Sequence, residues 1–503
     1  MMSKIELPKE TESFWHKTQT VEKHPELNQN LKVDIAVVGG GISGILTAYE
    51  LAKTNQSVGL FEARDFLHGT TGFTTAKLSA QHNLLYDELI ERYDELTAKL
   101  YYQANMQGIE KIKTLITKEA IDCDFKKQIA YVYTQNESKV ESFKKEALAY
   151  HKLKIDGGLK ENLPVNLDIK AAIAMREQYE FHPVAFLAGM IKILKQMGVK
   201  IYEQTTINEM KDGNSVTLTT NNGHTITSKQ VVCATQYPVH EPENIYASRF
   251  KPEISFALAC EIEEVFPGGM YLNADHPKRT FRAMRANKKE YLLIGGESHS
   301  IGDGLSDQER YENILKSAKE MFTVKNVVAH WSSHDLITKD KVPFIGLIHP
   351  NEKNIYVMTG FSKWGLANVA IGAEVIKDLI TQQENVYSQL FNPHREIPSL
   401  KKETEKEESS DYHSSIHHSD IKSLNAKEAI IINKGESSKV GVYKDSTKTL
   451  HYLDMACTHL GCHVKWNDGD KTWDCPCHGS RFSAMGDVVA GPATKPLKKL
   501  KNK

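Results

Sequence analysis

Residues 33–44 read VDIAVVGGGISG, an apolar strand pattern that runs directly into three glycines and then into a helical pattern. The helical stretch covers residues 42–53, and a second apolar run follows at residues 58–61 and leads into Glu62. A strand, a tight turn, a helix and another strand form the repeating unit of a parallel sheet covered by helices. This stretch therefore predicts an α/β fold.

The glycines of this turn fall at Gly39, Gly41 and Gly44, and Glu62 lies 18 residues after Gly44. We expect Gly39 to allow a tight turn, Gly41 to let the backbone approach a pyrophosphate, and Gly44 to let the helix lie close to the strand. The start of the helix favours a phosphate, and Glu62 can accept hydrogen bonds from a ribose. A flexible turn without a ligand is the alternative. The complete context favours a dinucleotide site.

Alternating strand-like and helical segments continue to about residue 380. Helical spacing covers residues 89–116 and 183–197, while Asp212-Gly213 and Asn222-Gly223 predict hairpin turns. A strand at residues 355–359 and a helix at residues 365–380 then restore the α/β pattern. We expect a Rossmann-type dinucleotide-binding domain interleaved with an antiparallel substrate domain.

The composition fits a globular chain of more than one domain. Of 503 residues, 40% are hydrophobic and 25% charged, and 63 basic against 64 acidic residues give a net charge of −1. Without a basic excess we expect no nucleic-acid partner. No apolar run reaches the roughly 20 residues of a membrane span, and the polar start lacks a secretory signal, so we expect a cytoplasmic protein. The predicted units are an N-terminal extension (1–30), the α/β part with its interleaved antiparallel domain (31–395), a polar linker (396–420) and a small all-β module (421–503).

Four of the seven cysteines crowd into 21 positions near the C-terminus. Residues 457–462 read CTHLGC and residues 475–480 read CPCHGS, with twelve residues between them. Each box supplies a Cys and a His, the set required by a [2Fe–2S] cluster with two thiolates on one iron and two imidazoles on the other. The same four residue types also suit a tetrahedral zinc ion, which is the alternative.

The first part of the chain resembles the FAD-dependent amine and amino-acid oxidase superfamily of the glycine oxidase and sarcosine oxidase type. The resemblance rests on the glycine turn, on residues 69–77 (GTTGFTTAK) and on residues 359–366 (TGFSKWGL), and it spans residues 31–380. It implies FAD as the cofactor and places around it, beside the glycines and Glu62, the residues Arg64, Thr70, Thr71, Thr74, Gly360, Lys363, Gly365 and Leu366.

The two cysteine boxes resemble those of a Rieske [2Fe–2S] domain, and the extra cysteine in each box and the Gly-Ser of the second favour this over zinc. The resemblance assigns Cys457 and Cys475 to one iron, and His459 and His478 to the other. It also implies a disulfide between Cys462 and Cys477. Ser480 matches a hydroxyl donor to the cluster, whereas Phe482 stands where high-potential members have a Tyr. We therefore expect a cluster potential below the upper part of the Rieske range.

Together the two resemblances imply oxidation of a small amine or amino acid at the flavin, with electrons passed singly to the cluster and then to an unidentified acceptor. Arg282 is the candidate catalytic residue, because a guanidinium pairs well with a substrate carboxylate. One alternative is a non-catalytic redox shuttle or sensor. Another is a Rieske oxygenase, which would need a mononuclear iron site and which the dinucleotide turn disfavours.

Overall fold

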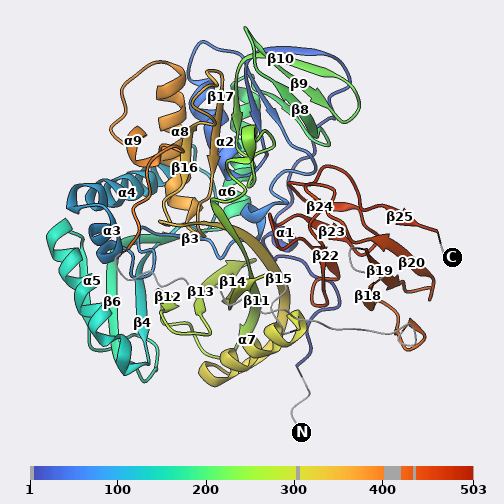
Figure 1. Ribbon diagram of the computed structural model, residues 1–503. Helices are drawn as coiled ribbons and strands as arrows, with labels where there is room; N and C mark the ends of the chain where they lie inside the picture. The colour runs from blue at the N-terminus through green and yellow to red at the C-terminus, as the bar shows by residue number, and fades with distance from the viewer. Residues whose placement is uncertain (1–4, 302–305, 401–420, 434–437, 502–503) are drawn as a thin grey trace.

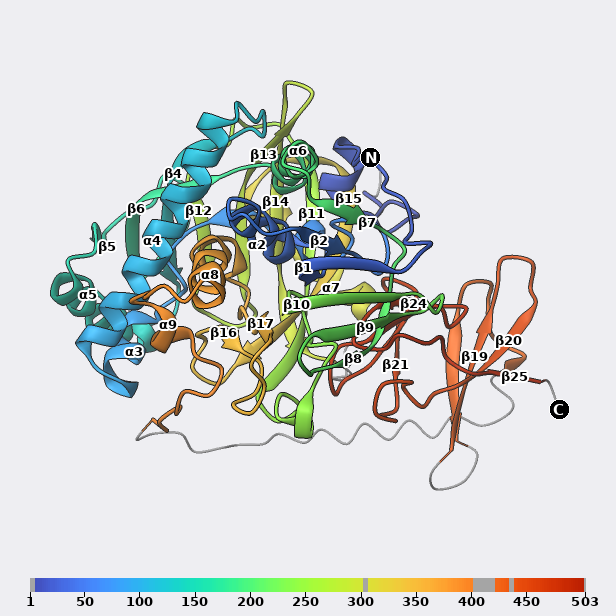
Figure 2. The same ribbon diagram turned by 90° about the horizontal axis from the view of Figure 1, so that it is seen from above.

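The computed structural model describes residues 5–301, 306–400, 421–433 and 438–501. Most of the predicted linker, residues 396–420, lies outside these ranges. The first part of the chain forms two sheets with helices around them, and the C-terminal module lies against one side of it (Figure 1). Seen from above, the module is on the side opposite the helices α3, α4 and α5 (Figure 2).

The stretch that decides the fold forms the centre of the first sheet. Strands β1 (Leu31–Val38) and β2 (Val58–Phe61) pair in parallel with α2 (Ile42–Ala52) between them, as the sequence predicts. The sheet order is β16-β17-β10-β1-β2-β7. Its other strands are β7 (Lys200–Tyr202), β10 (Thr225–Cys233), β16 (Phe344–Leu347) and β17 (Ile355–Thr359). The hairpin of β8 (Ile207–Lys211) and β9 (Val216–Thr220) pairs with β10, so it extends this sheet rather than the antiparallel one.

The second sheet is mainly antiparallel and forms the interleaved domain, in the order β15-β11-β14-β13-β12-β4-β6-β3, with β5 (Gly157–Lys160) beside β6. Helix α7 (Asp307–Met321) covers one face, and the opposite face contributes Ala257, Met284, Leu293 and Trp331 to the core shared with the first sheet. The strands are β3 (Lys77–Leu78), β4 (Lys126–Thr134), β6 (Ala171–Glu180), β11 (Phe250–Ile262), β12 (Met270–Asn273), β13 (Arg279–Ala286), β14 (Lys289–Ser300) and β15 (Val324–Thr338).

Helices close the remaining sides. Helix α8 (Gly365–Ile380) packs on α2 and on α4 (Glu95–Lys118), so closely that a Cβ at Gly108 would lie 2.0 Å from the Ala367 carbonyl oxygen. The N-terminal extension contains the short α1 (Phe14–Thr18), whose Trp15 is buried. The remaining helices are α3 (Tyr86–Arg92), α5 (Val140–Leu153), α6 (Pro183–Gln196) and α9 (Ser388–Phe391).

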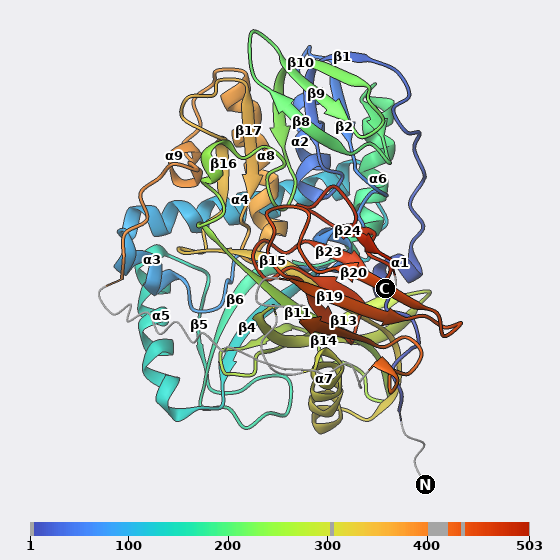
Figure 3. The ribbon, with the colours of Figure 1, turned by 45° about the vertical axis from the view of Figure 1, so that its right-hand side comes forward.

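The C-terminal module is all-β, as predicted. One sheet has the order β18-β19-β20-β25 and the other the order β21-β22-β23-β24, and Trp473 and Phe482 are fully buried in its core. The module lies in front of the first part in Figure 3, and Figure 1 shows the second of these sheets on the side of the module nearer β15. The strands are β18 (Ala429–Asn433), β19 (Lys439–Lys444), β20 (Leu450–Asp454), β21 (Lys465–Asn467), β22 (Thr472–Asp474), β23 (Arg481–Ser483), β24 (Val488–Ala490) and β25 (Lys499–Leu500).

Candidate functional site

The turn between β1 and α2 requires glycine at two positions. Gly39 has φ +117°, and a Cβ there would lie 2.7 Å from the Ala234 carbonyl oxygen at the end of β10. A Cβ at Gly44 would lie 1.8 Å from the Gly39 carbonyl oxygen, so α2 could not lie this close to β1 with any larger residue. The roles expected for Gly39 and Gly44 correspond to this geometry.

The surroundings of the turn fit a bound dinucleotide. Helix α2 has Gly41 at its N-cap and no side-chain cap, although the Ile42 N–H donates to Thr71 Oγ1 at 3.1 Å. A Cβ at Gly41 would lie 3.0 Å from that hydroxyl, so the backbone here has room for a close ligand only because Gly41 has no side chain. Glu62 accepts N–H groups of Gly40 (2.6 Å) and Arg64 (2.9 Å), which hold its carboxylate beside the turn.

The two other segments expected around the flavin meet at the face of the second sheet. Thr70 Oγ1 donates to the His334 carbonyl at 2.9 Å, and the Trp15 indole donates to the Thr74 carbonyl at 2.7 Å. In the later segment, Gly360 has φ +70°, and Lys363 Nζ contacts a carboxylate oxygen of Glu253 at 2.9 Å. Gly365 begins α8, and Leu366 is buried in its first turn.

Arg282, the candidate catalytic residue, is 1% exposed on β13. Its guanidinium donates to the carbonyls of Thr75 (2.7 Å), Ala283 (2.6 Å) and Phe181 (3.4 Å) and lies 3.7 Å from Glu180. A substrate carboxylate would have to displace these partners.

The two cysteine boxes come together at one end of the module. Cys457 and Cys475 are buried free thiols, and the Cys475 thiol donates to the Cys457 sulfur, which together with the Ser480 hydroxyl lowers the pKa of Cys457 to about 6. The His459 and His478 rings lie 5.0 Å apart, centre to centre. Within the described residues, the buried His459 Nδ1 has no hydrogen-bond partner. Two thiols, two imidazoles and an orphaned ring nitrogen fit a Rieske cluster.

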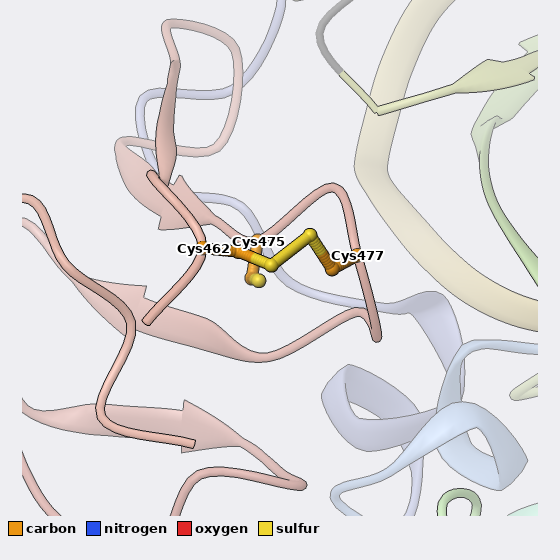
Figure 4. A group of neighbouring side chains, drawn as sticks. All are labelled: Cys462, Cys475 and Cys477. Atoms are coloured by element: carbon orange, nitrogen blue, oxygen red, sulfur yellow. A yellow bond between two sulfur atoms is a disulfide. The ribbon is translucent and has the colours of Figure 1, made fainter. Parts of the chain in front are cut away.

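Cys462 and Cys477 form a disulfide with an S–S distance of 2.08 Å, which joins the two boxes. Figure 4 shows the Cys475 sulfur beside this bond, and the three sulfurs lie within 4.8 Å of one another. The disulfide sulfurs carry no thiolate, so Cys475 is the member of this group that is free to bind a metal. The expected disulfide is confirmed.

Tyr237, four residues after β10, contacts both cluster histidines. Its ring centre lies 5.3 Å from that of His459 and 5.2 Å from that of His478, edge to face. The Tyr237 hydroxyl donates to Glu241 at 2.6 Å, and burial together with this carboxylate raises its pKa. The histidine edge of the cluster site therefore rests on the first part of the chain.

A polar network fixes this docking. Arg481 of the module bonds Asp470 (2.7 Å), Asp474 (3.1 Å) and, across the contact, the Ser332 hydroxyl (3.0 Å). Tyr311 of α7 donates to Asp470 at 2.7 Å. Burial alone would raise the pKa of Asp474, but Arg481 and a neighbouring histidine hold it well below its ordinary value. Both carboxylates are nearly inaccessible and are paired with Arg481, so the contact has one preferred orientation.

His334 of β15 connects the cluster boxes to the flavin segments. Its Nδ1 lies 3.1 Å from the Gly479 carbonyl oxygen of the second box, and its Nε2 lies 3.3 Å from Asp474. Its own carbonyl accepts the Thr70 hydroxyl. His334 thus contacts both the segment expected to line FAD and the box expected to hold iron.

The family of this chain follows from a comparison with known sequences. The family described as FAD dependent oxidoreductase matches residues 34–379, more than half of the chain. The chain belongs to the FAD-dependent oxidoreductase family. The family described as Rieske [2Fe-2S] domain matches residues 416–501. The protein is therefore an FAD-dependent oxidoreductase with a C-terminal Rieske domain, and its cofactors are FAD and a [2Fe–2S] cluster rather than zinc.

Similar proteins share either the whole arrangement or its first part. YhfW of Bacillus subtilis, named as a Rieske 2Fe-2S iron-sulfur protein, is 38% identical over 501 residues, 97% of each chain. Gamma-glutamylputrescine oxidoreductase of Escherichia coli is 22% identical over 394 residues, 74% of this chain and 89% of its own. Glycine oxidase of Geobacillus kaustophilus has the same fold over 73% of this chain and 100% of its own, with a TM-score of 0.62 and 18% identity.

Two features of this oxidoreductase were not foreseen in the sequence. These features are the contacts of Tyr237 and His334 with the cluster boxes. Neither residue belongs to a motif, and the one usable signal is that Tyr237 follows the end of a parallel strand, where ligands bind in such sheets.

In the part of the chain that the structure describes, no helix is long and apolar enough to cross a membrane.

Proposed function

We propose that this oxidoreductase oxidises a small amine or amino acid and delivers the electrons to its own Rieske domain, from which an unidentified acceptor takes them. FAD, when bound, accepts the two electrons released with the substrate C–H bond, and the cluster carries one electron at a time. Two named relatives support the substrate class, because glycine oxidase and gamma-glutamylputrescine oxidoreductase carry amine compounds in their names.

The observation that carries the proposal is the contact of Tyr237 with His459 and His478. Histidines are the outer ligands of a Rieske cluster, and here both rest on a residue that follows the strand beside the dinucleotide turn. Ala234, three residues earlier, lies against Gly39. A shuttle that received electrons only from outside would have no need to cover its histidine edge with the flavin-binding part.

Aromatic rings also connect Tyr237 with the late segment expected beside the flavin. The Tyr237 ring lies 6.0 Å from that of Phe250, and a Cβ at Gly360 would lie 2.8 Å from Phe250. Gly360 begins the late segment expected beside the flavin. The chain of Tyr237, Phe250 and Gly360 therefore supports a short path between the two cofactor sites.

In this proposal the residues of the glycine turn, the two cysteine boxes and Tyr237 have separate roles. Gly39, Gly41 and Gly44 give the phosphates access to the start of α2, and Glu62 binds the ribose. In the Rieske domain, Cys457 and Cys475 hold one iron and His459 and His478 the other. Tyr237 keeps water away from the histidine edge and fixes its distance from the flavin-binding part.

Anaerobic mixing with small amines and N-methyl amino acids tests the proposal. We expect a compound that bleaches flavin absorption and then produces the reduced Rieske electron paramagnetic resonance signal. Tyr237→Ala should slow the second step at least tenfold and leave the first unchanged, while Tyr237→Phe, which keeps the ring, should behave like the parent protein. If no compound bleaches the flavin, the non-catalytic shuttle or sensor is the better description.

A further inference from the structure

The first cysteine box has an open side. Tyr237 covers the histidine edge of the cluster site, so a partner from outside the chain has to approach from another direction. In the first box Thr458 and Gly461 are exposed, and Leu460, directly after His459, is 51% exposed. One exposed leucine is ordinary on a protein surface, and its surroundings decide what it indicates.

A lysine-rich segment lies against this open side. Residues 495–501 contain four lysines, and all four are exposed. The Thr458 hydroxyl donates to the Lys495 carbonyl at 2.6 Å, and the Asp454 N–H donates to the Lys498 carbonyl at 2.9 Å. The segment ends in β25, which pairs with β20 on the side of the module away from the first part (Figures 1 and 2). These lysines are therefore attached to the first box and to the strand that leads into it.

The module as a whole has few carboxylates to balance its lysines. Its described residues, 421–433 and 438–501, include eleven lysines and seven acids. Three of the acids, Asp468, Asp470 and Asp474, are used in the contact with the first part of the chain. None of the eleven lysines forms an ion pair with a carboxylate that the structure describes. The module is therefore strongly basic outside the docking contact, although the whole chain has a net charge of −1.

Local contacts preserve this basic character. The Asp454 carboxylate, next to the lysine-rich segment, accepts the Ala456 N–H at 3.0 Å. Burial, and next the positive charge of Lys439, lower the pKa of Lys465, so these two lysines experience each other's charge. A surface of this kind attracts a negatively charged partner and repels a positively charged one.

We propose that the surface formed by Leu460 and the lysines of residues 495–501 docks an acidic protein that accepts one electron at a metal centre. The inference rests on the proposed function, which leaves the acceptor unidentified. One electron passes from the reduced cluster to the acceptor, so one iron is oxidised from Fe²⁺ to Fe³⁺ and the metal of the acceptor is reduced. Two such encounters remove the electron pair that one substrate molecule releases.

The parts of this surface have different roles in the encounter. The lysines steer the acidic partner toward the cluster, and Leu460 supplies an apolar centre for the small contact that is typical of transient electron-transfer complexes. An anionic lipid surface would also be attracted by the lysines, but it accepts no electron. The position of the lysines beside the first box therefore favours a redox protein.

The test uses the full-length protein with both cofactors bound, its cluster reduced chemically and the excess reductant removed, so that no substrate is needed. The probes are two one-electron acceptors of opposite charge, acidic plastocyanin and basic cytochrome c, and the reaction is followed by cluster absorption in a stopped-flow instrument. We expect the rate with plastocyanin to fall as salt is added and the rate with cytochrome c to rise. Leu460→Ala should slow plastocyanin without changing the salt dependence.

Charge reversal tests the lysines directly. Lys495→Glu combined with Lys498→Glu should slow oxidation by plastocyanin at least tenfold at low salt. The matched control is Lys427→Glu with Lys448→Glu, which makes the same charge change at the other end of β20 and should have a much smaller effect. Lys495→Gln with Lys498→Gln, which only removes the charges, replaces the reversal if that variant loses its cluster.

Binding is measured separately from electron transfer. Amide NMR shifts of isotope-labelled plastocyanin, with both proteins oxidised, should change on addition of the parent protein and of the control variant. The same shifts should be lost with the double variant at Lys495 and Lys498.

The outcomes separate this inference from the function on which it rests. A plastocyanin rate that is independent of salt, or that both double variants reduce equally, overturns the docking surface. Lysine-dependent binding to vesicles of phosphatidylserine and phosphatidylcholine, without salt-dependent oxidation by plastocyanin, overturns it in favour of a lipid surface. Salt-dependent oxidation that requires Lys495 and Lys498, in a protein whose flavin no compound bleaches, supports the docking surface and overturns only the proposed substrate oxidation.

Discussion

Removing the Tyr311 hydroxyl should loosen the docking of the Rieske domain without touching either cofactor site. Tyr311→Phe deletes the O–H that donates to Asp470 across the contact at 2.7 Å and leaves the buried ring in place. Asp470 keeps its bond to Arg481, so the carboxylate stays paired inside the module. The change therefore acts on the contact between the two parts.

The size of the effect follows from the kind of bond. A hydrogen bond to a charged acceptor contributes about 1.5–3 kcal/mol, and water replaces part of it when the module undocks. We expect the lower end, about 1.5 kcal/mol, which is roughly a tenfold shift in the docking equilibrium. Adding Ser332→Ala removes a second hydroxyl, which contacts both Asp470 and Arg481, and should bring the total shift to about a hundredfold.

Hydrogen exchange measures this shift, since amides that are protected by docking exchange at rates set by local opening. Peptides covering residues 330–336 and 478–483 should exchange about tenfold faster in Tyr311→Phe. Tyr271→Phe is the control, because the Tyr271 hydroxyl donates to the Gly268 carbonyl within the same part of the chain. Equal exchange in Tyr311→Phe, Tyr271→Phe and the parent protein would refute the docking role of the network.

Three further outcomes are expected. His459→Ala or His478→Ala should abolish the Rieske electron paramagnetic resonance signal and keep flavin absorption; loss of both would show that the two sites do not form independently. Phe482→Tyr should raise the cluster potential by tens of millivolts in protein-film voltammetry, because Phe482 is buried in the same core as Cys457 and Cys475 and a phenol can donate to a ligand sulfur; an unchanged potential would mean that this position does not face the cluster. Asp307→Asn should stabilise the protein increasingly as pH rises: burial and three neighbouring aspartates raise the pKa of Asp307 to about 8, so the folded state binds a proton that the unfolded state loses near pH 4, and folding stability contributed by this proton falls between these values. Thermal unfolding from pH 5 to pH 9 gives the difference, and a constant gap between variant and parent contradicts it.

The sequence predicted correctly those elements whose signals lie in neighbouring residues. The strand, turn and helix around Gly39 and the late helix at Gly365 have the predicted bounds to within a residue or two, because glycine placement and apolar spacing specify them directly. The Cys462–Cys477 disulfide followed from the resemblance of the two boxes. The hairpin turns on either side of Val216 lie where the Asp-Gly and Asn-Gly pairs predicted them. The sheet that this hairpin joins was not predicted, since a hairpin signal does not say which sheet the hairpin will join.

Contacts between distant segments could not be predicted in this way. Tyr237 meets His459 across more than two hundred residues, and His334 meets Gly479 at a separation of 145. Neither residue belongs to a motif, because a single tyrosine after a strand and a single histidine within a strand are both common in sequences. Lys77 was read as the end of a polar stretch, and only the packed structure shows that no carboxylate among the described residues pairs with it.

The character of the docking surface bears on how the two cofactors cooperate. An apolar contact is tolerant of sliding, whereas Arg481, Asp470 and Asp474 are buried charges whose cost is offset only when every partner is in position. A docked state that is slightly rotated would separate Asp470 from Tyr311 and Ser332, and Asp474 from His334, although both carboxylates stay paired with Arg481 inside the module. The network penalises wrong orientations in this way more than it strengthens the right one. The covalent connection between the two parts already keeps them at high effective concentration, so little affinity is required of the contact. The network therefore holds the histidine edge on Tyr237 in one register. If the proposed function is right, substitutions in the network should change the rate of electron transfer from flavin to cluster while both cofactors stay bound.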